Sequence, residues 1–187
     1  MTRALIVLAL LLVVLAGCGG SSSSSSSSSS KPVDPNAKET SPAGDIPDNQ
    51  AYVAYSPPGA DYSVKVPEGW ARTAKGGAVT FTDKLNAIRM EELTAKGTSV
   101  TALARSAEHA KSGKVSIVKR NAGPAVRITY LAPGRPDPVT GKTRTDAVER
   151  YAFVHRGQQV VLTLSGPKGA DNVDPWKLVT DSLRWSR

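Results

Sequence analysis

The chain has 187 residues with 24 basic and 16 acidic side chains, a formal net charge of +8 at pH 7. It contains one cysteine and two histidines. This composition excludes an intramolecular disulfide and any metal site built on several cysteines. Because Cys18 is the one cysteine, no other position can supply a cysteine nucleophile.

The first 17 residues have the pattern of a secretory signal peptide. Arg3 precedes an apolar run from Ala4 to Ala16, which is shorter than the about 20 residues that a bilayer-spanning helix needs. The run ends in Leu15-Ala16-Gly17-Cys18, and small residues before the cleavage site are typical of exported proteins. An incidental cysteine at the end of a plain signal or membrane segment is the alternative.

The segment Leu15–Cys18 resembles the lipobox of bacterial lipoproteins. The resemblance implies that the leader is cut before Cys18 and that the Cys18 thiol carries a diacylglycerol, with acyl chains such as palmitate. Two acyl chains on one residue give stable membrane anchoring, whereas one chain binds only marginally. The sequence therefore predicts lipidation at Cys18.

Residues 18–50 are predicted to form a flexible linker. Gly19-Gly20 precedes ten consecutive serines, Ser21 to Ser30, and Lys31–Gln50 is rich in proline, small and polar residues. Such segments bury too little apolar surface to offset their ordering entropy. A coil of this length averages about 30 Å end to end. A glycosylated serine stalk is the alternative.

The remaining residues, 51–187, are predicted to form a single domain. They carry 21 basic and 12 acidic side chains, a net charge of +9. Alternating apolar and polar residues are typical of half-buried antiparallel strands. This pattern occurs at Tyr62–Val66, Val79–Phe81, Asn86–Leu93, Val126–Tyr130, Tyr151–His155 and Val160–Leu164.

Two stretches have helical spacing instead. Apolar residues recur helically over Val100–Ala110, with Ser99 as a candidate N-cap and Gly113 as a stop. Asp174-Pro175 is typical of an N-cap followed by a first helical residue. The second helix would bury an apolar stripe of Trp176, Val179 and Leu183.

Strands, one helix, further strands and a closing helix predict an α+β domain with an antiparallel β-sheet and two main helices. The order resembles the PsbP-like domain, as does the segment Tyr62–Trp70 together with the terminal Ser182–Trp185. That domain occurs in extrinsic PsbP proteins of photosystem II, in a Ran-binding nuclear transport factor and in actinobacterial lipoproteins of the LpqN-like type. The resemblance implies a binding or assembly factor, not an enzyme.

No catalytic residue, metal ligand or cofactor is predicted. His109 and His155 lack metal-ligand spacing. The Ser165–Lys168 segment matches the Ser-x-x-Lys pattern of penicillin-recognising enzymes but lacks its companion motifs. Gly141–Thr143 lacks the earlier glycine of a phosphate-binding loop, and Asp171–Asp174 lacks the later glutamate of a calcium loop.

Four residues are candidates for contact with a ligand or partner. Arg135, Lys142 and Arg144 lie in Pro133–Thr145, which is predicted to be a basic loop between two strands. Trp70 is first of all a candidate for core packing, but it follows a strand end, where pockets often open. The basic loop is a candidate for binding anionic lipid or wall polymer, and the alternative is that it is simply solvated. No nucleic-acid partner is predicted.

The sequence favours a membrane-anchored, non-enzymatic binding or assembly module on the extracytoplasmic face of the cell membrane. Its predicted partner is an envelope protein, lipid or polymer. One alternative is an envelope hydrolase or transferase whose site is assembled only by the fold. The other is a basic module that binds anionic lipid or cell-wall polymer.

Overall fold

A computed structural model describes residues 43–95, 98–109, 112–136 and 141–186. The predicted signal peptide, the predicted lipidation site Cys18 and the predicted linker up to residue 42 lie outside these residues. Within the described ranges, the helices are too short or too polar for any of them to cross a bilayer.

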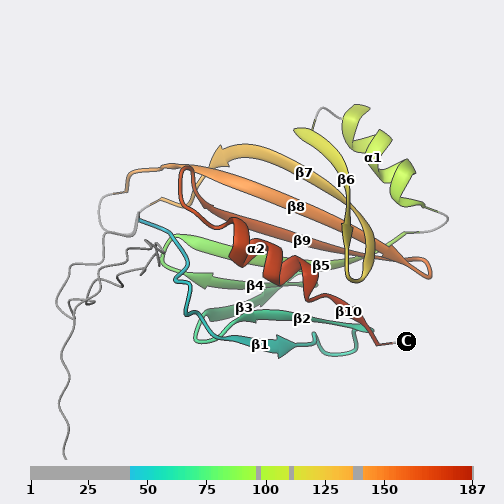
Figure 1. Ribbon diagram of the computed structural model, residues 1–187, viewed down its shortest axis with the longest axis horizontal. Coiled ribbons are helices and arrows are strands. Elements are labelled where there is room, and N and C mark those ends of the chain that lie inside the picture. The colour runs from blue at the N-terminus through green and yellow to red at the C-terminus, as the bar shows by residue number, and fades with distance from the viewer. Residues whose placement is uncertain (1–42, 96–97, 110–111, 137–140, 187) are drawn as a thin grey trace, which may run out of the picture. The chain divides into compact units, whose positions relative to one another are not determined.

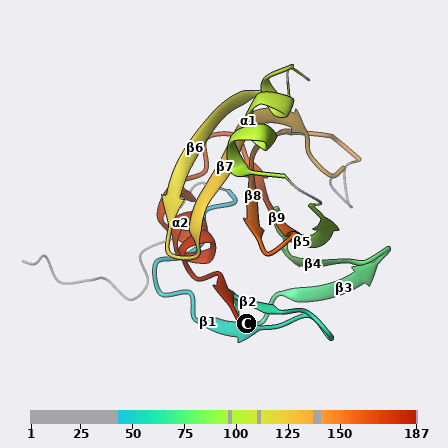
Figure 2. The ribbon, with the colours of Figure 1, turned by 90° about the vertical axis from the view of Figure 1, so that its right-hand side faces the viewer.

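Seven strands form one antiparallel sheet with the order β3-β4-β5-β9-β8-β7-β6. The sheet is strongly twisted, so its two edge strands, β3 and β6, run in different directions (Figure 2). In the order of the sheet, the strands are β3 (Ala71–Lys75), β4 (Ala78–Asp83), β5 (Asn86–Thr94), β9 (Gln158–Pro167), β8 (Thr145–His155), β7 (Gly123–Pro133) and β6 (Lys114–Arg120).

Three further strands form a smaller antiparallel sheet beside the large one (Figure 1). Its central strand is β2 (Tyr62–Pro67), which pairs with β1 (Tyr52–Tyr55) on one side and with the two-residue β10 (Arg184–Trp185) on the other. Because β10 is so short, most of β2 on that side is left for other contacts.

Two helices cover opposite faces of the large sheet. On β8, Tyr151 and Phe153 belong to the main core, which also contains residues of β2 and of α2 (Val173–Asp181). The intervening Ala152 points to the other face and packs in a second cluster with Ala104 of α1 (Val100–His109). The predicted α+β domain with an antiparallel sheet and two helices is confirmed for the described residues.

Local sequence signals account for several element boundaries. The backbone N–H of Ala102 donates to Ser99 Oγ at 3.1 Å, so Ser99 caps α1 as predicted. The link between β8 and β9 is a tight turn in which Arg156 and Gly157 have φ values of 47° and 80°. Two positive φ values in succession match a type I′ hairpin turn.

Four strands have no counterpart among the predicted ones: β1, β3, β6 and β10. All five side chains of β3 are exposed, so the strand carries no alternation that marks a buried face. β10 has only two residues and depends on its partner β2. These strands are defined by pairing and not by their own pattern.

The predicted start of the second helix is wrong. The helix begins at Val173, and Trp176 N–H donates to the Asn172 carbonyl oxygen at 3.0 Å, so Asn172 and not Asp174 precedes the first turn. Pro175 then lies inside the first turn, where its missing N–H leaves no hydrogen bond unmade.

The predicted linker extends too far toward the domain. Ile46 is 4% exposed and belongs to the main core. The Asn172 side chain accepts from Ile46 N–H at 2.8 Å and donates to the Gly44 carbonyl at 3.0 Å, and Asn86 donates to the same carbonyl at 2.9 Å. We call Gly44–Ile46 the N-terminal latch. Its composition is linker-like, but it is stabilised by side chains far away in the sequence.

Candidate functional site

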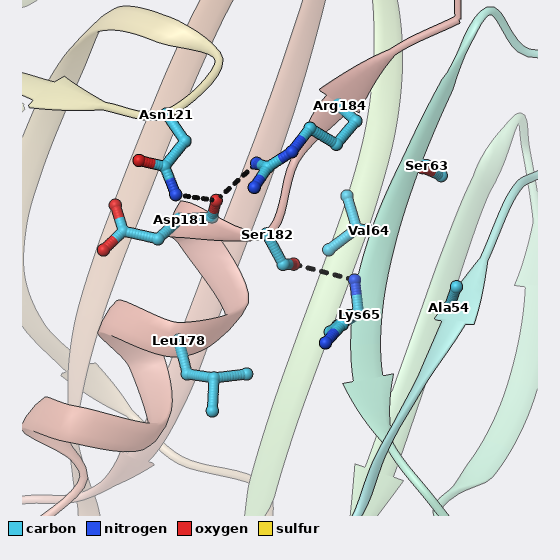
Figure 3. A pocket seen from close by; sticks show the side chains of 9 residues that line it. All are labelled: Ala54, Ser63, Val64, Lys65, Asn121, Leu178, Asp181, Ser182 and Arg184. Carbon is cyan, nitrogen blue, oxygen red and sulfur yellow. Dashed lines mark hydrogen bonds between the residues drawn. The ribbon is translucent and has the colours of Figure 1, made fainter.

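A groove of about 380 Å³ lies between the end of α2 and the outer face of the three-stranded sheet (Figure 3). Its residues come from three distant parts of the sequence, and most of them are polar or charged. They are Ala54, Ser63, Val64, Lys65, Asn121, Leu178, Asp181, Ser182 and Arg184.

The strand wall of the groove follows from the period of β2. Tyr62 and Val64 are buried in the main core, so the alternate side chains of Ser63 and Lys65 point outward. Ala54 of β1 is the register partner of Lys65, and Arg184 of β10 is the partner of Ser63. The register therefore brings these side chains to one face of the small sheet.

Ser182 joins the end of α2 to β2. Its backbone N–H donates to the carbonyl oxygens of Leu178 and Val179 at 3.0 and 3.2 Å. Its hydroxyl donates to the Val179 carbonyl at 2.6 Å and accepts from Lys65 N–H at 2.7 Å. Because the hydroxyl is engaged both as donor and as acceptor, Ser182 is placed as a structural link and not as a nucleophile.

Arg120 of β6 attaches the same end of α2 to the large sheet. Its Nε donates to Thr180 Oγ1 at 3.0 Å and lies 3.6 Å from the Asp181 carboxylate, while its Nη2 donates to Tyr151 Oη at 3.0 Å. The pKa of Tyr151 is raised, mainly because the phenol is buried and secondly because it donates a hydrogen bond to Glu149. The helix end that forms one wall of the groove is thus held on two sides.

The charges that line the groove are mostly positive. The Asp181 carboxylate is paired with both Arg120 and Lys177. Arg184 Nη1 donates to the carbonyl oxygens of Asp181 and Leu183 at 2.7 and 2.8 Å.

Lys65 is exposed and makes no side-chain hydrogen bond or ion pair within the described part of the chain. The groove therefore presents one unpaired ammonium group and one anchored guanidinium group.

Among the described residues, the groove has no recognisable catalytic set. The described residues that line it include no histidine to act as a base for Ser63. His109 is exposed at the end of α1, and His155 stacks on Trp185 with ring centroids 5.0 Å apart. In the described residues, no three His, Asp or Glu side chains come together in a way that could hold a metal ion.

The basic loop predicted between two strands lies where β7 ends and β8 begins. Gly134 N–H donates to the Arg144 carbonyl at 2.7 Å, which closes the loop at its base. Arg144 pairs with Asp146 at 3.0 Å and donates to the Leu85 carbonyl at 2.7 Å. Arg144 is therefore used within the fold.

Of the other three sequence candidates, Arg135 reaches the same turn as Arg144, at Lys84–Asn86, whereas Trp70 lies elsewhere in the fold. Arg135 Nη2 donates to the carbonyl oxygens of Lys84 and Asn86 at 3.3 and 3.4 Å. Lys142 is exposed. Trp70 packs against the main core. None of the four candidates lines the groove, and their contact with a ligand or partner stays a prediction.

Sequence reasoning missed the residues that form the groove. The sequence shows that Ser63 and Lys65 alternate with apolar residues, which indicates that both side chains point outward. The alternation does not indicate which other segment of the chain packs beside them. Ser182–Trp185 is part of the resemblance to the PsbP-like domain. Its pairing with β2 joins residues more than a hundred positions apart, as the Lys65–Ser182 hydrogen bond does with a separation of 117, and no local signal indicates that.

No protein-family model matches the chain, and none of the curated proteins matches its sequence. Similar solved structures include a protein from Bacteroides thetaiotaomicron VPI-5482, with a TM-score of 0.52, 15% identity and 72% of this chain covered. The chain spans about half of that protein, since the match covers 48% of it. At this identity the likeness concerns the fold alone.

Two weaker likenesses are to proteins of the kinds that the sequence resemblance names. Cyanobacterial PsbP (CyanoP) from Synechocystis sp. PCC 6803 has a TM-score of 0.47 and 16% identity, over 77% of this chain and 99% of that one. The Saccharomyces cerevisiae Ran-binding protein Mog1p has a TM-score of 0.46 and 10% identity, over 73% and 96%. These two likenesses support no statement about function.

Proposed function

We propose that this protein is a non-enzymatic binding module, anchored through lipidated Cys18 on the extracytoplasmic face of the cell membrane, and that the groove binds another envelope component. The observation that carries the proposal is the groove itself. It combines a wall held by hydrogen bonds with polar groups from three chain segments and, within the described part of the chain, a Lys65 side chain without a partner and no catalytic set.

The position of the groove suits an anchored module. The described chain enters the fold at the N-terminal latch, whose Ile46 is held by Asn172 at the start of α2. Asp181 and Ser182 line the groove at the other end of that helix. Nine helical residues rise about 13 Å. The groove is therefore separated from the N-terminal latch by about the length of α2.

A membrane tether favours weak binding of this kind. A flexible linker of the predicted length restricts the domain to the neighbourhood of the membrane and raises its effective concentration toward other membrane components. A groove with few apolar side chains is expected to bind a partner weakly, and tethering both to one membrane makes such weak binding sufficient.

The groove is a better candidate than the basic loop. Arg135 and Arg144 already donate to carbonyl groups of the β4–β5 turn, and Arg144 is also paired with Asp146. An incoming anion would compete with these contacts at the loop. At Lys65 it would displace none within the described residues.

Site-specific photocrosslinking in cells tests the proposal. We expect a photoreactive residue in place of Ala54, which is exposed in the groove, to give a discrete adduct in the lipidated full-length protein. The matched control carries the same residue at Thr101, exposed on α1. The adduct should be absent there, because α1 covers the other face of the large sheet.

The two positions give an unambiguous comparison. Equal adducts at Ala54 and Thr101, or none at Ala54 in cells where the protein is normally processed, would contradict groove binding. Mass spectrometry of a discrete Ala54 adduct identifies the bound component and shows whether it is a protein, a lipid or a polymer.

A further inference from the structure

The described lining of the groove contains two cations, Lys65 and Arg184, and stabilisation of the end of α2 accounts for only one of them. Cations near a helix C-terminus are favoured by the helix dipole, and Arg184 Nη1 serves that role by donating to the carbonyl of Asp181, the last residue of α2, as well as to that of Leu183 just beyond the helix. The Lys65 side chain caps no carbonyl among the described residues, although it lies in the same groove. Its charge is left for another partner.

Arg184 is oriented in advance for a second contact. Its two hydrogen bonds through Nη1 hold the guanidinium plane. The Nε and Nη2 edge makes no hydrogen bond within the described part of the chain. Two parallel N–H groups on one edge of a guanidinium match the two oxygens of a carboxylate.

Lys65 and Arg184 lie close enough to act on the same group. Arg184 is the register partner of Ser63, and Lys65 follows two residues later on the same face of β2. Such diagonal neighbours on adjacent strands are about 7–8 Å apart, within reach of long side chains. Figure 3 shows both residues beside Ser182 at the end of α2.

The groove also has an apolar side. Leu178 on α2 is 42% exposed and lines the groove together with Ala54 and Val64. Val64 is only 1% exposed, with its side chain in the main core, so Leu178 and the exposed Ala54 provide the apolar surface of the described lining. Leu178 and Ala54 offer a surface for one or two apolar side chains.

We infer that the groove recognises an acidic segment of a partner protein, which places a carboxylate between Lys65 and Arg184 and an apolar side chain on Leu178. This inference rests on the proposed function of the groove and adds the chemical class of its partner. The Asp181 carboxylate repels the carboxylate of the partner only weakly, because Asp181 is already paired with Arg120 and Lys177.

The test uses the full-length chain in detergent micelles and two short peptides with blocked termini. One peptide alternates glutamate and leucine, and the other has glutamine in place of each glutamate. We expect the glutamate peptide to shift the backbone amide NMR signals of Ser63, Lys65, Leu178 and Arg184. The glutamine peptide should leave these signals unshifted. Binding should weaken as the salt concentration rises, because exposed charges are screened.

Variants identify the charges responsible. Lys65→Gln and Arg184→Gln should each raise the peptide Kd about two- to fivefold, the range for exposed ion pairs. Lys75→Gln, which removes an exposed cation from β3 outside the groove, should leave the Kd unchanged. Thermal unfolding of each variant shows whether a loss of binding reflects a loss of structure.

Several results would overturn the inference. One is equal binding of the two peptides, and another is an unchanged Kd in Lys65→Gln. A third is a shift of the same amides by vesicles of phosphatidylglycerol and not by the glutamate peptide, which would assign the cations to lipid headgroups. If the Ala54 crosslink to a protein persists in any of these cases, groove binding stands and only the acidic class of the partner is refuted.

Discussion

Asn172 shows how much of the fold depends on single buried polar side chains. It is 3% exposed, and its amide bonds to Ile46, to Gly44 and, at 3.1 Å, to Asn86. Buried amides are costly unless such partners are present. Gly166 leaves room for the pair, because a Cβ atom there would lie 2.4 Å from Asn86 Oδ1.

Tyr62 carries a prediction at the same scale. It is 2% exposed, and burial, reinforced by Glu92 and Tyr55, raises its pKa from 10.0 to about 12. The folded state therefore keeps the phenol protonated while the unfolded state ionises it. The stabilisation is fully present below pH 10 and is lost as the pH rises toward about 12.

We expect Tyr62→Phe to flatten the dependence of the free energy of unfolding on pH in this interval. Urea unfolding at stepped pH measures that dependence, with Tyr130→Phe on β7 as the matched control. The assignment fails if wild-type protein and Tyr62→Phe lose stability in parallel between pH 10 and about 12.

At the scale of elements, contacts across the sequence move the boundaries of α2 and of the linker. The latch looks like linker because it is short and rich in small and polar residues. Its order comes from Ile46 in the main core and from the side chains of Asn86 and Asn172. A domain boundary drawn from composition alone therefore falls several residues too late.

Two deletions separate the linker from the latch. Removing Ser21–Thr40 should leave the melting temperature unchanged, because the latch is retained. Extending the deletion to Ile46 should destabilise the domain by about 3–5 kcal/mol, the loss of one buried aliphatic side chain plus buried amides without partners.

Differential scanning calorimetry of both proteins measures the effect. If both deletions leave the melting temperature unchanged, the contacts of the latch contribute nothing to stability. If both lower it, residues before Ala43 take part in the fold.

At the scale of the whole molecule, the proposed binding groove and the proposed anchor have separate roles. The twisted sheet, α2 and the three-stranded sheet hold Lys65 and Arg184 in place. The residues before Ala43 are proposed to decide where that surface is presented.

The anchor carries its own prediction. Cys18→Ser should leave an uncleaved precursor that carries no lipid, because the serine hydroxyl is a far weaker nucleophile than a thiolate. Mass spectrometry of the purified chain and fractionation of membranes measure processing and location. Ser22→Ala, in the serine run, should be processed normally. Normal maturation and membrane retention of Cys18→Ser would refute lipidation at this residue.

The sequence by itself determined the features that depend on neighbours along the chain. The alternation in β2 and β5 and the N-cap at Ser99 follow from residues within a few positions of one another. The lipobox prediction also depends on a local pattern alone, and it remains a prediction.

Only the tertiary structure decided which surfaces face each other. Strand β3 and strand β10 exist through their partners, the latch through Asn86 and Asn172, and the groove through a link between Lys65 and Ser182. Backbone periodicity states which side of a strand or helix points outward. It carries no information on which distant segment satisfies the groups found there, because that depends on how the whole chain minimises unpaired polar groups and exposed apolar surface together.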